Sequence, residues 1–173
     1  MYYSLLILIA LVFTGCASIS APSSKVIVAY EGNPVLHFEG KGSAAGIMLM
    51  GAMGPAGIAI GVAIDVGIAK DIAKAYKQSR SDFIKKAKPD IAAMLTDNTM
   101  QHIAVNIKGY GFKFRQGQMY AWLKGDCTKY EKLTLFDELF KVDLTVSALK
   151  SNGKLVEASL TRALVNTIKN RCV

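Results

Sequence analysis

The side chains that most often carry catalysis or bind metals are sparse in this sequence. Its two histidines, His37 and His102, lie far apart, and neither has a second ligand at a metal-binding spacing. The G-x-S-x-G, H-E-x-x-H and phosphate-loop motifs do not occur. Asp137 and Glu138 are adjacent, and adjacent residues of a strand point to opposite faces. We therefore expect no catalytic residue, no metal site and no cofactor, in a protein that is not an enzyme.

The three cysteines offer other chemistry, because thiols can be acylated or oxidised in pairs. Cys16 ends an apolar N-terminal segment, which leaves Cys127 and Cys172. In an oxidising compartment we expect these two to form a disulfide that ties the last helix to the sheet. Two separate free thiols are the alternative. A thioredoxin-like role is disfavoured, since the C-x-x-C spacing is absent.

The first sixteen residues have the layout of a secretory signal, with an apolar core followed by small residues. Phe13-Thr14-Gly15-Cys16 resembles the lipobox of bacterial lipoproteins. Phe13 stands where that family prefers leucine, and no Lys or Arg precedes the apolar core. The resemblance implies that residues 1–15 are a cleaved signal peptide and that Cys16 becomes an acylated N-terminus bound to membrane lipid. An ordinary cleaved signal or an uncleaved anchor remains the alternative.

Residues 42–76 form a long apolar stretch in which small residues recur at intervals of four. No charged residue occurs from Ser43 to Ile64. Because residues four apart share one face of a helix, the spacing predicts an apolar ridge beside a shallow groove. Gly54-Pro55 interrupts the stretch and predicts two helical arms in place of one rod. The ridge consists of Ile60, Ile64, Ile68 and Ile72, and the groove of Gly57, Gly61, Ala69 and Ala73.

Small-residue helices pack closely against apolar neighbours, and three settings remain open for these arms. They could lie in a bilayer, pack against the arms of other copies, or form the buried core of a soluble domain. An arm from Ser43 to Met53 is about 16 Å long, too short for a hydrocarbon core of about 30 Å. In lipid we therefore expect a helical hairpin that enters and returns, in preference to one kinked span.

Positive charge follows the apolar arms. The formal net charge is +8 and the pI is near 9.4, which favours anionic partners such as anionic lipid, lipopolysaccharide or peptidoglycan. We expect the helix to continue to about Lys88, with Pro89 starting a second helix. Its basic residues are candidates for an anionic surface, and the alternative is a solubilising face. These candidates are Lys70, Lys74, Lys77, Arg80, Lys85 and Lys86.

The rest of the chain alternates apolar and polar residues, which predicts strands. Residues 25–30 and 34–39 are expected to be strands around a turn, and further strands are expected at 103–107, 110–115, 119–124 and 142–148. Asn152-Gly153 predicts a type I′ hairpin into a strand over 155–160. An amphipathic helix is expected to close the chain.

The fold class is therefore α+β: a Gly/Ala-rich helical hairpin and a basic helix, followed by a small antiparallel sheet with a C-terminal helix. We expect this organisation: signal peptide 1–15, lipidated N-terminus and linker 16–24, two short strands 25–41, apolar arms 42–69, basic helix and second helix 70–101, and sheet with C-terminal helix 102–173.

Over residues 1–76 the chain resembles glycine-zipper-containing outer-membrane lipoproteins, through its lipobox and its small-residue arms. Ala17 and Ser18 follow Cys16 with no aspartate, which in that family resembles export to the outer membrane. The resemblance implies a non-enzymatic, lipid-anchored envelope protein, facing the periplasm, with a structural or interaction role and no nucleic-acid partner. The alternatives are a homo-oligomeric pore or secretion-accessory subunit, and a periplasmic ligand-binding domain.

Overall fold

The computed structural model describes residues 25–95 and 102–173. The expected signal peptide, Cys16 and the linker to residue 24 lie outside the described residues.

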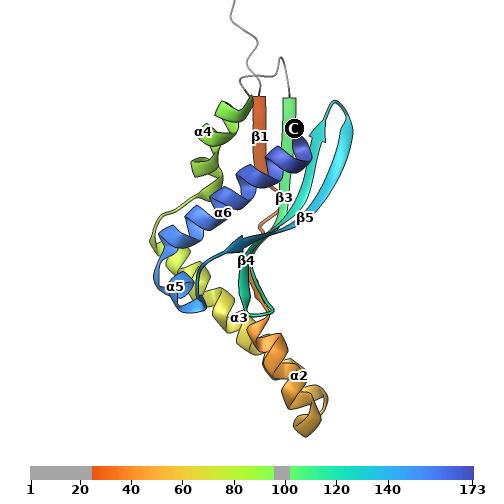
Figure 1. The fold of residues 1–173 in the computed structure, drawn as a ribbon, viewed down its shortest axis with the longest axis vertical. Coiled ribbons are helices and arrows are strands. Elements are labelled where there is room, and N and C mark those ends of the chain that lie inside the picture. Colours follow the sequence, from red (N-terminus) through yellow and green to blue (C-terminus); the bar gives the residue numbers. More distant parts are fainter. Residues whose placement is uncertain (1–24, 96–101) are drawn as a thin grey trace, which may run out of the picture.

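A five-stranded mixed sheet forms the body of the protein (Figure 1). The central strand β3 (His102–Arg115) pairs antiparallel with β4 (Gln118–Lys129), which pairs antiparallel with β5 (Lys132–Val142). On its other edge, β3 pairs in parallel with β1 (Lys25–Tyr30) along its first half and with β2 (Leu36–Glu39) along its second half.

The expectation of a small antiparallel sheet within residues 102–173 is thus correct for β3 to β5. The first two strands, expected around a turn of their own, join the same sheet and pair in parallel with β3. Parallel strands need a long crossover connection, and the helices between β2 and β3 provide it. The strand over 132–142 was not expected from the sequence. The expected strand over 142–148 is wrong beyond Val142, because residues 143–145 are irregular and residues 146–148 are helical, and the expected strand over 155–160 is also helical.

The helices of the described residues confirm the α+β class. They are α2 (Lys41–Met53), α3 (Pro55–Gln78), α4 (Phe83–Leu95), α5 (Val146–Ser151), α6 (Gly153–Thr167) and a short π-helix, η1 (Ile168–Cys172). In Figure 1, α6 crosses one face of the sheet and α4 lies beside it, whereas α2 and the first half of α3 project beyond the body as a hairpin. The predicted break at Gly54-Pro55 and the predicted C-terminal helix are confirmed.

The hydrophobic core lies between this face of the sheet and the helices. The alternation of β3 places Ile103, Val105 and Ile107 inside, where all three are buried. Leu160 and Leu164, four apart on α6, are fully buried in the same core cluster. The apolar faces that the strand and helix periodicities predict therefore pack against each other in one core.

The expected basic helix to Lys88 is wrong, because α3 ends at Gln78 and a new helix begins at Phe83. Arg80 has a positive φ of 51°, and the side chain of Asp82 accepts hydrogen bonds from the N–H groups of Ile84 and Lys85, as an N-cap does. Pro89, expected to start a helix, lies inside α4.

Tyr76 connects the two helices on either side of this break. Its hydroxyl accepts a hydrogen bond from the N–H of Phe83 at 2.9 Å, which links the last turn of α3 to the first residue of α4. Burial raises the pKa of Tyr76 to about 12, so the hydroxyl remains protonated at neutral pH.

The predicted type I′ hairpin at Asn152-Gly153 is also wrong. The Asn152 side chain accepts hydrogen bonds from the N–H groups of Lys154 and Leu155 and caps the start of α6. Gly153 is required by packing, because a Cβ there would lie 2.2 Å from the carbonyl oxygen of Ala75 on α3. The same dipeptide thus serves helix capping and close helix contact.

This cap gives a testable prediction. Asn152→Ala removes the acceptor for the first N–H groups of α6 and should lower the free energy of unfolding by about 1 kcal/mol in urea titrations. Asn152→Asp keeps an acceptor at the same position and should retain most of the stability. Equal stability of the two variants would contradict the capping role.

Cys127 and Cys172, the pair expected from the sequence, lie at disulfide distance, with their Cα atoms 5.9 Å apart. Cys127 lies on β4 and Cys172 in η1, so the link ties the end of the chain to the sheet. Both residues are buried in the core cluster.

Removing this link should destabilise the body. Replacing both cysteines by alanine opens a loop with a sequence separation of 45 residues, and loop-closure entropy then predicts a loss of about 4 kcal/mol in the free energy of unfolding. Urea unfolding of the double variant and of the wild type with and without reductant measures this loss. A wild type that unfolds identically with and without reductant would show that the bond does not stabilise the fold.

Candidate functional site

The strongest candidate for a functional site is the apolar hairpin, defined as residues 41–66. It comprises α2 and the first half of α3, joined by a tight turn at Gly54 and Pro55. Gly54 has a positive φ of 58°, a conformation that glycine adopts without strain. Its N–H donates to the carbonyl oxygen of Met50, and the N–H of Gly57 donates to the carbonyl oxygen of Gly54. Proline has no N–H to satisfy at this position, so the turn makes few polar demands on its surroundings.

Glycines bring the two helices of the hairpin into backbone contact. A Cβ on Gly61 would lie 2.3 Å from the carbonyl oxygen of Gly42 and 2.9 Å from the Cα of Gly46. A Cβ on Gly57 would lie 2.6 Å from the carbonyl carbon of Leu49. These distances are too short for any side chain, so only glycine permits this approach.

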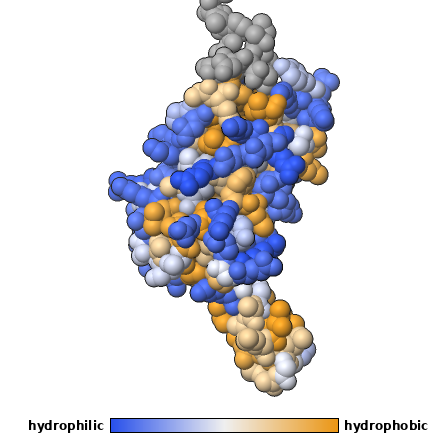
Figure 2. Space-filling view, viewed as in Figure 1, coloured by the Kyte–Doolittle hydropathy of each residue, from blue (hydrophilic) through white to orange (hydrophobic). Residues whose placement is uncertain are grey.

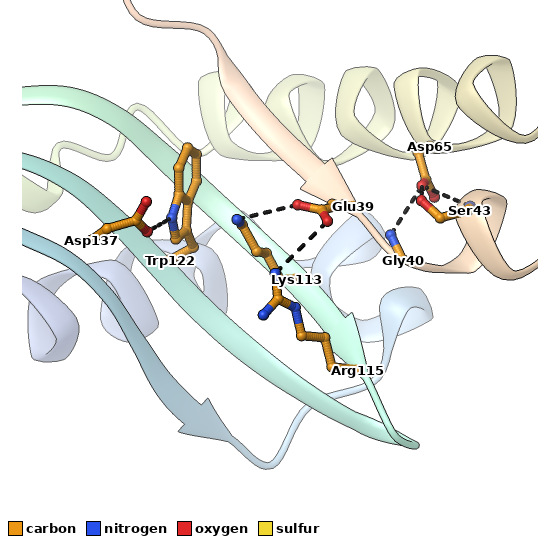
Figure 3. A network of polar contacts seen from close by, with 8 residues as sticks. All are labelled: Glu39, Gly40, Ser43, Asp65, Lys113, Arg115, Trp122 and Asp137. Atoms are coloured by element: carbon orange, nitrogen blue, oxygen red, sulfur yellow. Dashed lines mark hydrogen bonds and ion pairs between the residues drawn. The ribbon is translucent and has the colours of Figure 1, made fainter. Parts of the chain in front are cut away.

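A buried carboxylate joins the helices at the base of the hairpin (Figure 3). Asp65 of α3 is only 6% exposed. It accepts hydrogen bonds from the N–H groups of Gly40 at 2.9 Å, Gly42 at 2.6 Å and Ser43 at 3.1 Å, and from the Ser43 hydroxyl at 3.1 Å. The first N–H groups of a helix have no partner within it and carry partial positive charge, so an aspartate stabilises them.

Sequence reasoning missed Asp65, although a signal was present. Asp65 follows Gly61 by four residues, which places it on the same buried face of α3, and it is the first charged residue after the apolar run. A lone acidic residue on a face of glycines indicates a polar partner on the neighbouring helix.

The outside of the apolar hairpin is exposed and hydrophobic (Figure 2). Met48 is 84% exposed and Ile47 is 69% exposed. The interpretation of the arms as the buried core of this chain is therefore wrong. The large exposed side chains are Ile47, Met48, Met50, Met53, Ile58, Ile60, Val62, Ile64 and Val66.

The predicted ridge and groove do not act as single units. Along the ridge, Ile72 is fully buried in the core and Ile68 is half-buried against it, whereas Ile60 and Ile64 belong to the exposed hairpin. In the groove, Gly57 and Gly61 contact α2, while Ala69 and Ala73 pack against the core. Helix α3 is therefore divided, with one half in the hairpin and the other in the body.

The six basic residues expected to form an anionic-surface site are all exposed. Lys70, Lys74 and Lys77 share one face of α3, in the half that joins the body. The break after Gln78 separates them from Arg80 and from α4, which carries Lys85 and Lys86. The six do not lie on one continuous helix.

A polar network covers part of the other sheet face near the hairpin base (Figure 3). The Trp122 indole N–H donates to Asp137 at 2.6 Å, and the Lys113 Nζ lies 4.5 Å from the ring centroid of Trp122. Lys113 also pairs with Glu39 at 3.2 Å. These groups satisfy one another, which supports a structural role. Glu138, next to Asp137, instead contacts Arg171, so the two adjacent carboxylates have separate partners.

A second polar group on this face involves Asp126, which is 4% exposed. Lys108 lies 2.8 Å from its carboxylate, and the Asn106 amide donates to it at 2.9 Å. The hydrogen bond from Lys108, aided by that from Asn106, holds the pKa of Asp126 below its usual value, although burial alone would raise it. Asp126 thus remains ionised at neutral pH, and its contacts with Asn106 and Lys108 link the adjacent strands β3 and β4.

Comparison of the chain with protein-family models, curated proteins and solved structures found no match. Among residues 25–95 and 102–173, no helix has both the length and the apolar character needed to cross a membrane. Within the same residues, His, Cys, Asp and Glu side chains form no group that could hold a metal ion.

The glycine contact can be tested with a matched pair of substitutions. Gly61→Ala places a methyl group against the backbone of α2 and should destabilise the hairpin by about 1–3 kcal/mol. Gly67→Ala, on the same helix, meets nothing within 4 Å and should be neutral or stabilise by up to about 1 kcal/mol.

Hydrogen exchange followed by mass spectrometry measures the effect directly. The amides of α2 should exchange faster in Gly61→Ala than in the wild type, and at wild-type rates or slower in Gly67→Ala. Equal exchange in the two variants would contradict close packing at Gly61.

Proposed function

We propose that this chain is a non-enzymatic, lipid-anchored protein of the bacterial cell envelope, held at the outer membrane by acylated Cys16 and facing the periplasm. Its role is structural or interactive, and the apolar hairpin is its contact surface. The observation that carries this proposal is the exposure of large apolar side chains along the whole hairpin, such as Met48, Ile58 and Val62. Contiguous apolar surface of this kind marks a site of interaction with a protein or a membrane.

Two further observations support export to the envelope. The N-terminal segment ending in Cys16 has the order of a secretory signal and a lipobox. Cys127 and Cys172 lie at disulfide distance in the core, and structural disulfides belong to oxidising compartments such as the periplasm. The acyl chains on Cys16 would hold the protein firmly at the membrane, since each buried methylene contributes about 0.8 kcal/mol.

An oligomeric assembly subunit is the second candidate. The observation that favours it is a row of exposed small residues on the outside of α3: Ala56, Ala59 and Ala63. Small residues let helices of neighbouring copies approach closely. A water-filled pore would require polar side chains along one face of the hairpin, and residues 44–64 carry none. An assembly without a lumen suits this surface better than a pore.

Acylation of Cys16 is the decisive test. Mass spectrometry of the mature protein from bacterial membranes should find an N-terminal peptide that begins at Cys16 and carries fatty acyl chains, and the protein should fractionate with the outer membrane. Cys16→Ser should abolish the acylation. An unacylated mature terminus, or recovery in the cytoplasm, would refute the lipid-anchored envelope role.

A further inference from the structure

We infer that the apolar hairpin enters a lipid bilayer from one side and ends within it, near the midplane, so that the body remains on the side of entry. The inference deepens the proposed function, on which it rests, by naming the hydrocarbon of the membrane as the partner of the hairpin. Four features of the hairpin lead to it: its circumference, its internal hydrogen bonding, its length and the charges at its base.

The hairpin is apolar on all sides, not along one stripe. Successive residues turn by about 100° around a helix, so Ile47 and Met48, which follow the buried Gly46, cover the side of α2 that faces away from α3. On α3, Val62 and Ile64 lie on opposite sides of the buried Gly61. A partner protein with one binding groove would cover only one of these sides. A bilayer surrounds an inserted hairpin completely, and helices that are apolar all round are found in such surroundings.

Backbone groups at both ends of the hairpin are hydrogen-bonded within the protein, as a bilayer requires. Asp65 accepts from the N–H groups of Gly42 and Ser43 at the start of α2. At the tip, the N–H groups of Gly54 and Gly57 are bonded to carbonyl oxygens, and Pro55 has no N–H. The one carboxylate on the inner face of the hairpin thus lies at the end that joins the body, away from the tip.

The length of the hairpin sets the depth. Helix α2 has 13 residues, which corresponds to about 20 Å at about 1.5 Å per residue. One leaflet contributes about 15 Å of hydrocarbon to a bilayer. A hairpin of this length reaches the middle of the membrane when its base lies among the lipid headgroups, and it cannot reach the far surface. Both helices therefore return to the side from which they entered.

Positive charges lie where the headgroups would be. Lys41 begins α2, with its Nζ 5.3 Å from the centroid of the Phe114 ring on the body. Lys70 and Lys74 are exposed on α3 just beyond the apolar segment. The neighbouring acids are already paired, because Glu39 lies 3.2 Å from Lys113 and Asp71 lies 2.7 Å from Lys150. Lysines at this level attract lipid phosphates and stop the hairpin from entering further.

A single reporter in the full chain tests the depth. In a Cys16→Ser background, Met53→Cys supplies one reactive thiol at the tip, since Cys127 and Cys172 are paired. An environment-sensitive fluorophore on this thiol should shift to the blue with vesicles of phosphatidylethanolamine and phosphatidylglycerol. Nitroxides near the ends of the acyl chains should quench it more strongly than nitroxides on the headgroups. Lys132→Cys, at the start of β5 on the body, is the control and should show neither effect.

Charged substitutions test which surface is responsible. Met48→Glu combined with Ile58→Glu, both at exposed positions, should lower vesicle affinity at least about tenfold. The matched control is Leu133→Glu combined with Leu135→Glu, because these leucines of β5 are 59% and 70% exposed on the body. Vesicle affinity should not change in the control. Circular dichroism of each variant verifies that it is folded.

The outcomes separate this inference from the proposed function. If the wild-type protein is acylated at Cys16 but the Cys16→Ser chain does not bind vesicles, the lipid anchor is supported and insertion of the hairpin is refuted. If that chain instead forms a dimer in solution that Met48→Glu disrupts, the hairpin covers a second copy and the inference is again refuted. Quenching that is strongest at the headgroups would refute the stated depth. Vesicle insertion without acylation of Cys16 would support the inference and refute the lipid-anchored role.

Discussion

The carboxylate of Asp65 joins the two parts of the molecule that differ most in character. It lies on α3 where the exposed hairpin gives way to the packed body, and it binds the first N–H groups of α2 across the helix contact. Hydrogen bonds to an ionised acceptor are stronger than those between neutral groups, and burial strengthens them further. Without this carboxylate, the start of α2 would present unsatisfied donors beside an apolar surface. The glycine contacts above Asp65 depend on α2 being held at this distance.

The body holds the other half of α3 just as firmly. Gly153 lets the start of α6 approach the carbonyl oxygen of Ala75, and Tyr76 links the end of α3 to Phe83. The disulfide between Cys127 and Cys172 then fixes the end of the chain to the sheet that α6 covers. Helix α3 is therefore fastened at both ends, by glycine contacts to α2 in the hairpin and by glycine and tyrosine contacts in the body.

The features that followed from the sequence are those set by local chemistry. A glycine followed by proline, as at Gly54-Pro55, disfavours a continuous helix. Alternation in residues 103–107 places apolar side chains on one face of a strand. The pairing of Cys127 with Cys172 followed from elimination, once Cys16 was assigned to lipid.

The features that did not follow depend on distant partners. Asn152-Gly153 favours a hairpin locally, but the packing of Gly153 against α3 and the donors of α6 select a cap. The parallel pairing of β1 and β2 with β3 depends on the helices inserted between them in the chain. The position of Asp65 four residues after Gly61 indicates a polar partner on a neighbouring helix, but only the fold shows that this partner is the start of α2. For the hairpin, composition indicated close apolar packing, but only the fold shows that its large apolar side chains are exposed among the described residues.

The continuity of α3 has a mechanical consequence. Its 24 residues run without interruption from the tip of the hairpin to the break before α4, a stiff rod of about 36 Å. A rod that is held at one end and packed against α5 and α6 at the other fixes the orientation of the body as well as its position. A flexible lipid tether alone would leave the orientation of the body free. A hairpin held in the membrane would instead fix the orientation of α3 and of the body packed against it. The same faces of the sheet and of α6 would then point away from the membrane in every copy.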